Sequence, residues 1–385
     1  MTRHTIPLGR IMGIPIGLDY TWFLIFILLT WSFAVSYYPS EFGDWSAATY
    51  WVTGALTAIM LFVSVLIHEL GHSVIAMRYN IAIRRITLFL FGGVAEIAAE
   101  PPRASAEFWI AIAGPLTSFA LAGLFYLSMP LVSSFSPLFG LVKYLAYINL
   151  VLALFNVIPG FPLDGGRVFR AIVWGITRSF RKATLIAANV GRSIAFLFIL
   201  VGFWQIFSGN FGSGLWIAFI GWFLESAASA QVQQQMVQTL LAGHRVSDAM
   251  SRNVAMIPND ISLQQLVDEH ILSTGRRVFV VARQEEVAGL LTLHRLREIP
   301  REQWSSTRVE QAMIPAGQMR QARPDMELWE CFSTMTRAGV NQLPVMGADG
   351  RLVGMLSRED VISFLHTLQE MRPYESNLST SGTDH

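Results

Sequence analysis

His68, Glu69 and His72 are the residues whose types and spacing most directly indicate chemistry in this sequence. On a helix, residues four positions apart lie on one face, one above the other, so the two imidazoles can bind a single zinc ion. Glu69 is turned by about 100° from His68, which lets it reach a water at an open zinc position and take its proton. This H-E-x-x-H pattern predicts one zinc ion per chain, with two histidine ligands and Glu69 as the general base.

Asp164 is the residue that we expect to complete the zinc site. It lies in a stretch, 156–166, in which two prolines and three glycines prevent a regular helix. An unwound segment can direct Asp164 back toward the histidines, and it is the only acidic residue between Glu107 and Glu225. A second interpretation stays open, in which Asp164 caps the helix expected over 165–174.

The elements that must position these residues are membrane helices. Of the 385 residues, 52% are hydrophobic and only 14% are charged, whereas soluble domains average about 25% charged residues. Histidine and glutamate are costly in lipid, so their place inside a long apolar run supports a functional role. The expected spans cover about 17–37, 49–77, 106–129, 139–158, 190–208 and 213–230.

The distribution of charge predicts the orientation of these spans. Loops rich in Lys and Arg alternate with loops that nearly lack them, and the N-terminus and the C-terminal half fall on the basic side. By the positive-inside rule, both termini should be cytoplasmic. The first apolar run is too long for a signal peptide, so we expect it to be retained. The net charge of +1 gives no argument for nucleic acid as a partner.

Between the second and third spans, residues 84–97 are rich in β-branched and aromatic residues and are interrupted by Gly92 and Gly93. This composition predicts a small β-hairpin or sheet near the zinc site. An exposed strand edge there would bind an extended substrate by strand addition, which makes Gly92 and Gly93 candidate substrate-binding residues. The alternative is a plain connecting loop.

The second half of the chain carries an internal repeat after a polar linker at 231–244. Residues 245–250 match 308–313, and residues 287–292 match 352–357. Duplicated α/β units of about 60 residues indicate a soluble tandem module after the multi-pass α-helical membrane part. The expected domains are the membrane part over 1–230, the two repeats over 245–306 and 307–371, and a disordered tail over 372–385.

Residues 1–230 resemble the site-2 protease family of intramembrane zinc metalloproteases. The resemblance is carried by His68-Glu69-Leu70-Gly71-His72, the Gly92-Gly93 hairpin, Ala113-Gly114-Pro115, and Asn156 through Gly165. It implies cleavage of the transmembrane segment of a single-pass membrane protein, in regulated intramembrane proteolysis at the plasma membrane of a prokaryote. It also implies that Asn156 helps to position the substrate or the reaction intermediate.

The repeats resemble a pair of cystathionine-β-synthase (CBS) domains, which bind adenine nucleotides such as ATP and AMP between the repeats. The Gly, Ser or Thr, and Asp pattern of that family is present as Gly354, Ser357 and Asp360. The first repeat has Thr292 but Arg295 where the Asp belongs, so we expect at most one intact ribose site. The pair would serve as a nucleotide sensor or as a module for homodimerisation.

Two other functions are compatible with the sequence. Ionisable residues and broken helices inside the membrane also suit a CBS-regulated transporter or channel. Such a protein would not require the H-E-x-x-H spacing, and its spans would tend to repeat, which these do not. The second alternative is a non-catalytic homologue that acts as a membrane scaffold, although every required catalytic group is present.

Overall fold

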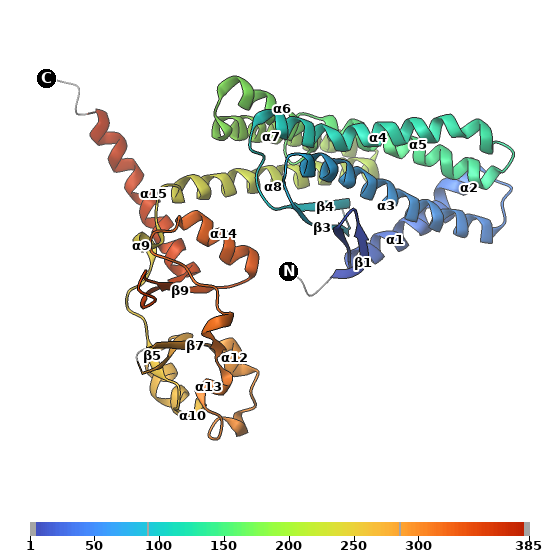
Figure 1. The fold of residues 1–385 in the computed structure, drawn as a ribbon. Coiled ribbons are helices and arrows are strands. Elements are labelled where there is room, and N and C mark those ends of the chain that lie inside the picture. The colour runs from blue at the N-terminus through green and yellow to red at the C-terminus, as the bar shows by residue number, and fades with distance from the viewer. Residues whose placement is uncertain (1–4, 91, 285, 381–385) are drawn as a thin grey trace. The chain divides into compact units, whose positions relative to one another are not determined.

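The structure, a computed structural model, describes residues 5–90, 92–284 and 286–380. The chain divides into two compact units, Met1–Gln235 and Met236–His385, each with its own hydrophobic clusters. Figure 1 shows long helices and a small sheet in the first unit, and strands, short helices and the long helix α15 (Arg358–Thr380) in the second.

Six helical segments that begin in the first unit are long and apolar enough to cross a membrane, among the residues that the structure describes. This confirms the predicted multi-pass helical part. The first segment, Thr21–Glu41, comprises α1 (Thr21–Ser32), a π-helical turn (Phe33–Tyr37) and α2 (Tyr38–Glu41). The others are α3 (Ala47–Arg78), α4 (Ala104–Val132), α5 (Ser136–Val157), α7 (Phe180–Phe207) and α8 (Phe211–Leu241).

The helix α3 carries the H-E-x-x-H pattern and uses different faces for different neighbours. It begins where Ser46 Oγ accepts a hydrogen bond from the backbone N–H of Thr49 at 3.2 Å, which caps the helix. His68 and His72 are both buried on one face. Leu66 and Leu70 lie on another face and pack against a β-sheet. The histidines are therefore held inside the helical bundle, with the sheet on a separate side of α3.

That sheet has four strands in the order β1 (Thr5–Ile11), β2 (Ile14–Asp19), β3 (Ile83–Phe89) and β4 (Gly92–Ile97). The β3–β4 hairpin confirms the strands expected over 84–97. β2 joins them by parallel pairing with β3, and β1 by antiparallel pairing with β2. The first span was expected to begin near residue 17. It begins at Thr21, because the residues before it form β2. Residues 14–19 alternate between buried and half-buried side chains, which is the pattern of a strand.

The helix α6 (Asp164–Thr177) follows the turn 158–163 and packs against α4 and α7. Close backbone approach fixes this turn. A Cβ at Gly165 would collide with the carbonyl oxygens of Val157 and Ile158, and one at Gly191 in α7 would lie 2.7 Å from the backbone nitrogen of Phe161. The glycines thus allow the chain to reverse directly into α6.

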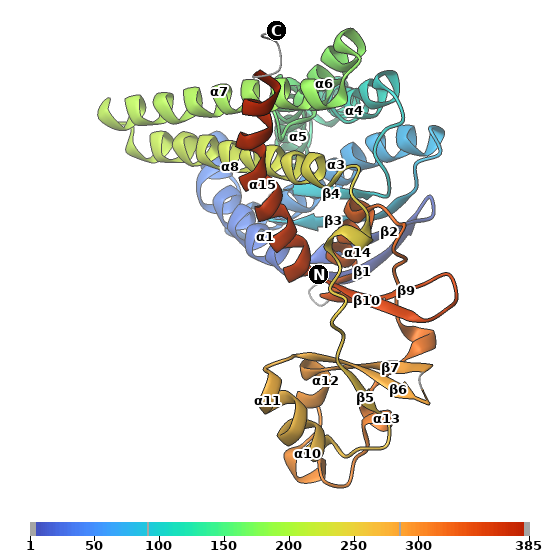
Figure 2. The ribbon, with the colours of Figure 1, turned by 90° about the vertical axis from the view of Figure 1, so that its left-hand side faces the viewer.

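The second unit contains two α/β repeats, and the first of them has the predicted order of strand, helix, strand, strand and helix. The first repeat comprises β5 (Met256–Pro258), the helical segments α10 (Leu263–Gln265), η2 (Leu266–Ile271) and α11 (Leu272–Thr274), β6 (Val278–Arg283), β7 (Glu286–Thr292) and α12 (Leu293–Arg297). The second comprises α14 (Leu328–Ala338), β9 (Gln342–Met346), β10 (Leu352–Ser357) and α15 (Arg358–Thr380), and in place of a first strand Ala322 forms a parallel bridge with Val345. The short strand β8 (Ile314–Pro315) pairs with β7 of the first repeat. Short helices α9 (Val246–Ala249) and α13 (Val309–Ala312) precede the two repeats, and Figure 2 shows α13 from another side.

Two segments are more helical than was expected. The polar linker at 231–244 is helical as far as Leu241, because it contains no Gly or Pro before Gly243 and its glutamines are good helix formers. The tail expected to be disordered over 372–385 continues helix α15 as far as Thr380. Residues 381–385 lie outside the described residues.

Candidate metal centre

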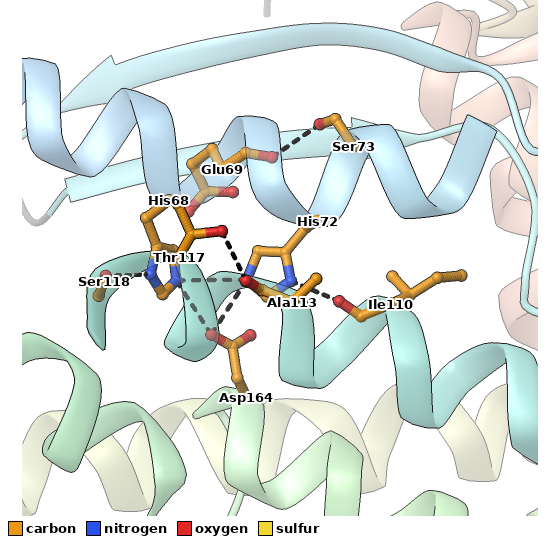
Figure 3. A network of polar contacts seen from close by, with 9 residues as sticks. All are labelled: His68, Glu69, His72, Ser73, Ile110, Ala113, Thr117, Ser118 and Asp164. Carbon is orange, nitrogen blue, oxygen red and sulfur yellow. Dashed lines mark hydrogen bonds and ion pairs between the residues drawn. The ribbon is translucent and has the colours of Figure 1, made fainter. Parts of the chain in front are cut away.

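His68, His72 and Asp164 converge on one point between α3 and α6. The Nε2 atoms of the two imidazoles are 3.2 Å apart, and Asp164 Oδ2 lies 3.1 Å from each of them. Figure 3 shows Asp164 reaching the two rings from the side opposite to α3. The side chains are nearly inaccessible, with exposed fractions of 5% for His68, 6% for His72 and 14% for Asp164. Asp164 is the first residue of α6. The N-cap of this helix is Leu163, so Asp164 does not occupy the cap position.

This triangle of donor atoms fits a zinc ion. In a tetrahedral site with ligand bonds of about 2.0–2.1 Å, neighbouring ligand atoms lie about 3.3 Å apart. The three observed separations of 3.1, 3.1 and 3.2 Å are close to that value. Three protein ligands would leave one tetrahedral position open, which is the arrangement of catalytic zinc sites.

The opposite nitrogen of each imidazole has a partner on α4. His72 Nδ1 donates to the backbone carbonyl of Ile110 at 2.7 Å, and His68 Nδ1 lies 2.8 Å from Ser118 Oγ. With the proton on Nδ1, each Nε2 presents its lone pair to the triangle. Partners of this kind fix the ring orientation and tautomer of metal-binding histidines. Both rings are therefore held in a state that is ready to bind a metal.

Gly114 provides the space in which the rings meet. It lies on α4 between the two partners of the imidazoles, and a Cβ there would come within 2.7 Å of His68 Nε2 and still closer to His72 Nε2. Any side chain at this position would occupy the space between the Nε2 atoms of the two imidazoles. A glycine is required at position 114 because the imidazole rings lie so close to its Cα, and not because its backbone has a positive φ.

Glu69 lies beside the triangle on α3 and is half-buried. Its side chain lies against Gly93 of β4. Gly92, the first residue of β4, has a φ of +129° and open space around its Cα. Asn156 lies in the last turn of α5 and is half-buried. The residues expected at the site thus come from α3, β4, α5 and α6.

Ser118 and the Ile110 carbonyl were not predicted as parts of the site, and Gly114 was noted only as part of the Ala113-Gly114-Pro115 motif. A hydroxyl in the middle of an apolar span was the one available signal for Ser118, since polar side chains in lipid need a partner. A backbone carbonyl carries no sequence signal, so the partner of His72 could not have been found in this way.

The candidate nucleotide residues line two clefts in the second unit. Thr292 and Ser357 line a cleft of about 720 Å³, together with Arg277, Arg297 and Arg358. Ser357 also lines a cleft of about 590 Å³, with Asp360 and Arg276. Gly354 lies in β10, where a Cβ would come within 2.9 Å of the Ser251 carbonyl oxygen.

Ser357 and Asp360 also have a structural role. Asp360 Oδ2 accepts hydrogen bonds from the backbone N–H of Ser357 at 2.8 Å and from Ser357 Oγ at 2.6 Å. The backbone N–H of Asp360 donates to Ser357 Oγ at 3.0 Å. This reciprocal pattern stabilises the start of α15. Part of the Ser and Asp pattern is therefore explained by helix capping alone.

Comparison with known families agrees with both halves of the chain. The model for peptidase family M50 matches residues 56–139 and 132–200. The model for the CBS domain matches residues 246–302 and 315–367. The two M50 matches contain His68, His72 and Asp164.

Individual relatives extend over the whole chain. Rip3 of Mycobacterium tuberculosis, named as a zinc metalloprotease, is 34% identical over 99% of this chain and 98% of its own length. The protein sll0528 of Synechocystis sp., named in the same way, is 33% identical over 95% of this chain and 96% of its own. Among solved structures, the site-2 protease from Methanocaldococcus jannaschii is 32% identical, with a TM-score of 0.41, over 60% of this chain and 95% of its own.

Proposed function

Because this chain belongs to peptidase family M50, the site-2 protease family, and carries a pair of CBS domains, we propose that it is an intramembrane endopeptidase. Its substrates would be transmembrane segments of single-pass membrane proteins, cut in regulated intramembrane proteolysis. The observation that carries this proposal is the triangle of donor atoms from His68, His72 and Asp164, with Glu69 beside it. A metalloprotease needs such a ligand set and an adjacent general base.

In the proposed mechanism His68, His72 and Asp164 hold one zinc ion per chain. The ion supplies Lewis acidity, which lowers the pKa of water and polarises a peptide carbonyl. Glu69 directly follows His68 on α3 and takes the proton of the attacking water at its carboxylate. It then gives that proton to the leaving amine, which restores the carboxylate for the next turnover.

The substrate would bind as an added strand. A peptide bond in a helix is shielded by its own hydrogen bonds, so the substrate must unwind before it is cut. β4 is the last strand in the order of the described sheet, and its outer edge can pair with an unwound segment. Because Gly93 packs against Glu69, a strand added at Gly92 and Gly93 would run past the general base. We assign to Asn156 the positioning of the substrate or intermediate.

We further propose that an adenine nucleotide, ATP or AMP, binds the second unit in the cleft lined by Ser357 and Asp360 and regulates cleavage. A carboxylate can accept hydrogen bonds from ribose hydroxyls, and Arg276 and Arg277 can contact phosphates. The first repeat has Arg295 at the position equivalent to Asp360, so one nucleotide per CBS pair is expected. The same module would support a homodimer.

The proposed orientation follows the charge pattern, with the enzyme in the plasma membrane of a prokaryote. An even number of spans leaves both ends of the chain on one side of the membrane. The basic loops favour the cytoplasm for that side. The Glu69 carboxylate would then take its water from the cytoplasmic side.

The test uses the full-length protein in lipid vesicles with a model transmembrane substrate. Glu69→Gln should keep one zinc per chain and lose cleavage, because an amide cannot take the proton. Asp164→Asn should lower the zinc content. Glu225→Gln is the matched control, since this half-exposed carboxylate of α8 pairs with Arg192 away from the triangle. Cleavage by Glu69→Gln at the wild-type rate would contradict the proposal, and substrate-independent ion flux would favour a transporter.

A further inference from the structure

A buried ion pair joins α4 to α6 close to the metal centre. The Nε and Nη2 groups of Arg170 both donate to Oε1 of Glu107, with an Nε–Oε1 distance of 2.7 Å. The exposed fractions of the two side chains are 9% for Arg170 and 0% for Glu107. Among the described residues, no other pair of an Arg or Lys with a carboxylate has both side chains below 10% exposure. Such a pair is costly to bury and calls for an explanation.

Each member of this pair is close in sequence to a part of the metal centre. Glu107 precedes Ile110, whose carbonyl holds His72, by one turn of α4. Arg170 follows Asp164 by six residues on α6, which is about 9 Å along the helix axis. The ion pair therefore links the helix that orients the imidazoles to the helix that supplies the third ligand.

Arg170 also holds the turn that leads into α6. Its guanidinium carbon lies 4.9 Å from the centre of the Phe161 ring and 4.6 Å from the centre of the Phe180 ring. Phe161 belongs to the turn 158–163, and Phe180 begins α7. Contacts of a cation with aromatic faces are directional, so one side chain fixes α4, α6, the turn and α7 together.

The energetics of the Glu107–Arg170 ion pair indicate that it positions α6 against α4 more than it stabilises the fold. Replacement of a buried ion pair by apolar residues is often neutral or stabilising, because two desolvated charges gain little in total. Here Glu107 Oε2 is buried and has no hydrogen-bond partner among the described residues, which adds to the cost. The remaining benefit of the pair is that it selects one arrangement of α6 against α4.

We propose that the Glu107–Arg170 ion pair positions Asp164 against His68 and His72, and so sets the zinc affinity of the site. This inference rests on the proposed function, since it requires that the three residues bind zinc. Neither residue touches the triangle, so both are positioning residues. Their effect should appear in metal binding itself and not only in proteolysis.

The experiment measures zinc affinity in full-length protein by competition with a chelator, together with the visible spectrum of the cobalt(II) form and the melting temperature. The central variant is the double substitution Glu107→Leu with Arg170→Met, which removes both charges. It should melt at or above the wild-type temperature. Its zinc affinity should fall by about 10- to 100-fold, as with loss of other outer partners of metal ligands. The cobalt spectrum should change with the displacement of Asp164.

Two further variants keep the test decisive. Arg170→Lys retains the charge but loses the fork of two N–H donors, and it should weaken zinc binding by about tenfold. It decides the question if the double variant does not fold. Arg192→Met is the matched control, because Arg192 pairs with Glu225 between α7 and α8 at 3.7 Å in a half-exposed setting. It should leave zinc affinity unchanged.

The outcomes separate this inference from the proposed function. A folded double variant, or Arg170→Lys, that binds zinc as tightly as the wild type would overturn the positioning role while the metal site stands. A wild-type protein that holds no stoichiometric zinc would overturn both. Weaker zinc binding in Arg192→Met, equal to that in Arg170→Lys, would also overturn it, because the effect would then be a general response to lost ion pairs.

Discussion

Gly93 of β4 lies directly against Glu69 of α3, so that a Cβ at Gly93 would be 2.7 Å from Glu69 Cγ and 3.3 Å from Val65 Cγ1. Real Cβ atoms do not approach other carbons this closely, so a side chain at Gly93 would displace Glu69. The strand and the proposed general base are thus in contact through a residue that has no side chain. The position of Glu69 depends on the hairpin as well as on α3.

From this contact we predict that Gly93→Ala lowers cleavage by about tenfold or more and leaves the zinc content unchanged. The physical reason is that proton transfer requires Glu69 within hydrogen-bond distance of its water. Gly17→Ala is the control, since a Cβ at Gly17 in β2 of the same sheet would have no neighbour closer than 3.7 Å. Equal cleavage by the two variants, measured in vesicles, would show that the contact has no effect on catalysis.

Ser118 should tune the zinc site through His68. Ser118→Ala removes the oxygen 2.8 Å from His68 Nδ1 and leaves that ring without a fixed tautomer. Zinc affinity should fall by about tenfold or more. Ser128→Ala on the same helix is the control, because Ser128 Oγ donates only to the Phe125 carbonyl. Titration against a chelator checks this, and an unchanged affinity in Ser118→Ala would argue against the role of Ser118.

In the CBS unit, Asp360→Asn should weaken AMP or ATP binding by about tenfold, because hydrogen bonds to a charged acceptor are the stronger ones. Asp268→Asn should have no effect, since Asp268 bonds with Gln264 and lines neither cleft. Arg295→Asp supplies the missing carboxylate and should raise the stoichiometry from one nucleotide per chain to two. Calorimetric titration of the full-length protein measures both quantities. Loss of binding in Asp268→Asn as well would point to a folding defect.

Cys331 should be inert in the folded protein. It is buried on α14 with an exposed fraction of 2%, and burial raises the pKa of its thiol to about 11. The thiolate is the reactive form, so at pH 8 only about one thiol in a thousand would be ionised. We predict no labelling by iodoacetamide at pH 8 until denaturant is added. Labelling of the folded protein as fast as that of an unfolded control peptide would contradict the described burial.

The chemistry-bearing residues were predictable because local spacing encodes them. The four-residue separation of His68 and His72 fixes their common face on any helix. Asp164 stood out because acidic residues are rare in the apolar half, and the Pro and Gly residues before it interrupt the helical pattern, which the structure shows as the turn 158–163. The structure brings these three residues together, as the sequence analysis expected.

Other features depend on long-range pairing that local patterns do not encode. β2 has too few residues to signal a strand next to an apolar span, and its partner β3 lies more than 60 residues away in sequence. Glu107 and Arg170 are 63 residues apart in sequence. The residues next to each of them in the sequence do not indicate that the two side chains pair. The end of α8 was misplaced because polarity, which suggested a linker, does not stop a helix that lacks Gly and Pro.

The parallel pairing of β2 with β3 also restricts how the protein can be made. Strands that share backbone hydrogen bonds must emerge on the same face of the bilayer, and the two spans Thr21–Glu41 and Ala47–Arg78 between them satisfy this condition. During biosynthesis, residues 14–19 can pair with β3 only after both spans are inserted and β3 has left the ribosome. A fusion partner that drew the N-terminus to the opposite face would deprive β3 of this neighbour, and the strands over Glu69 would lose half of their sheet.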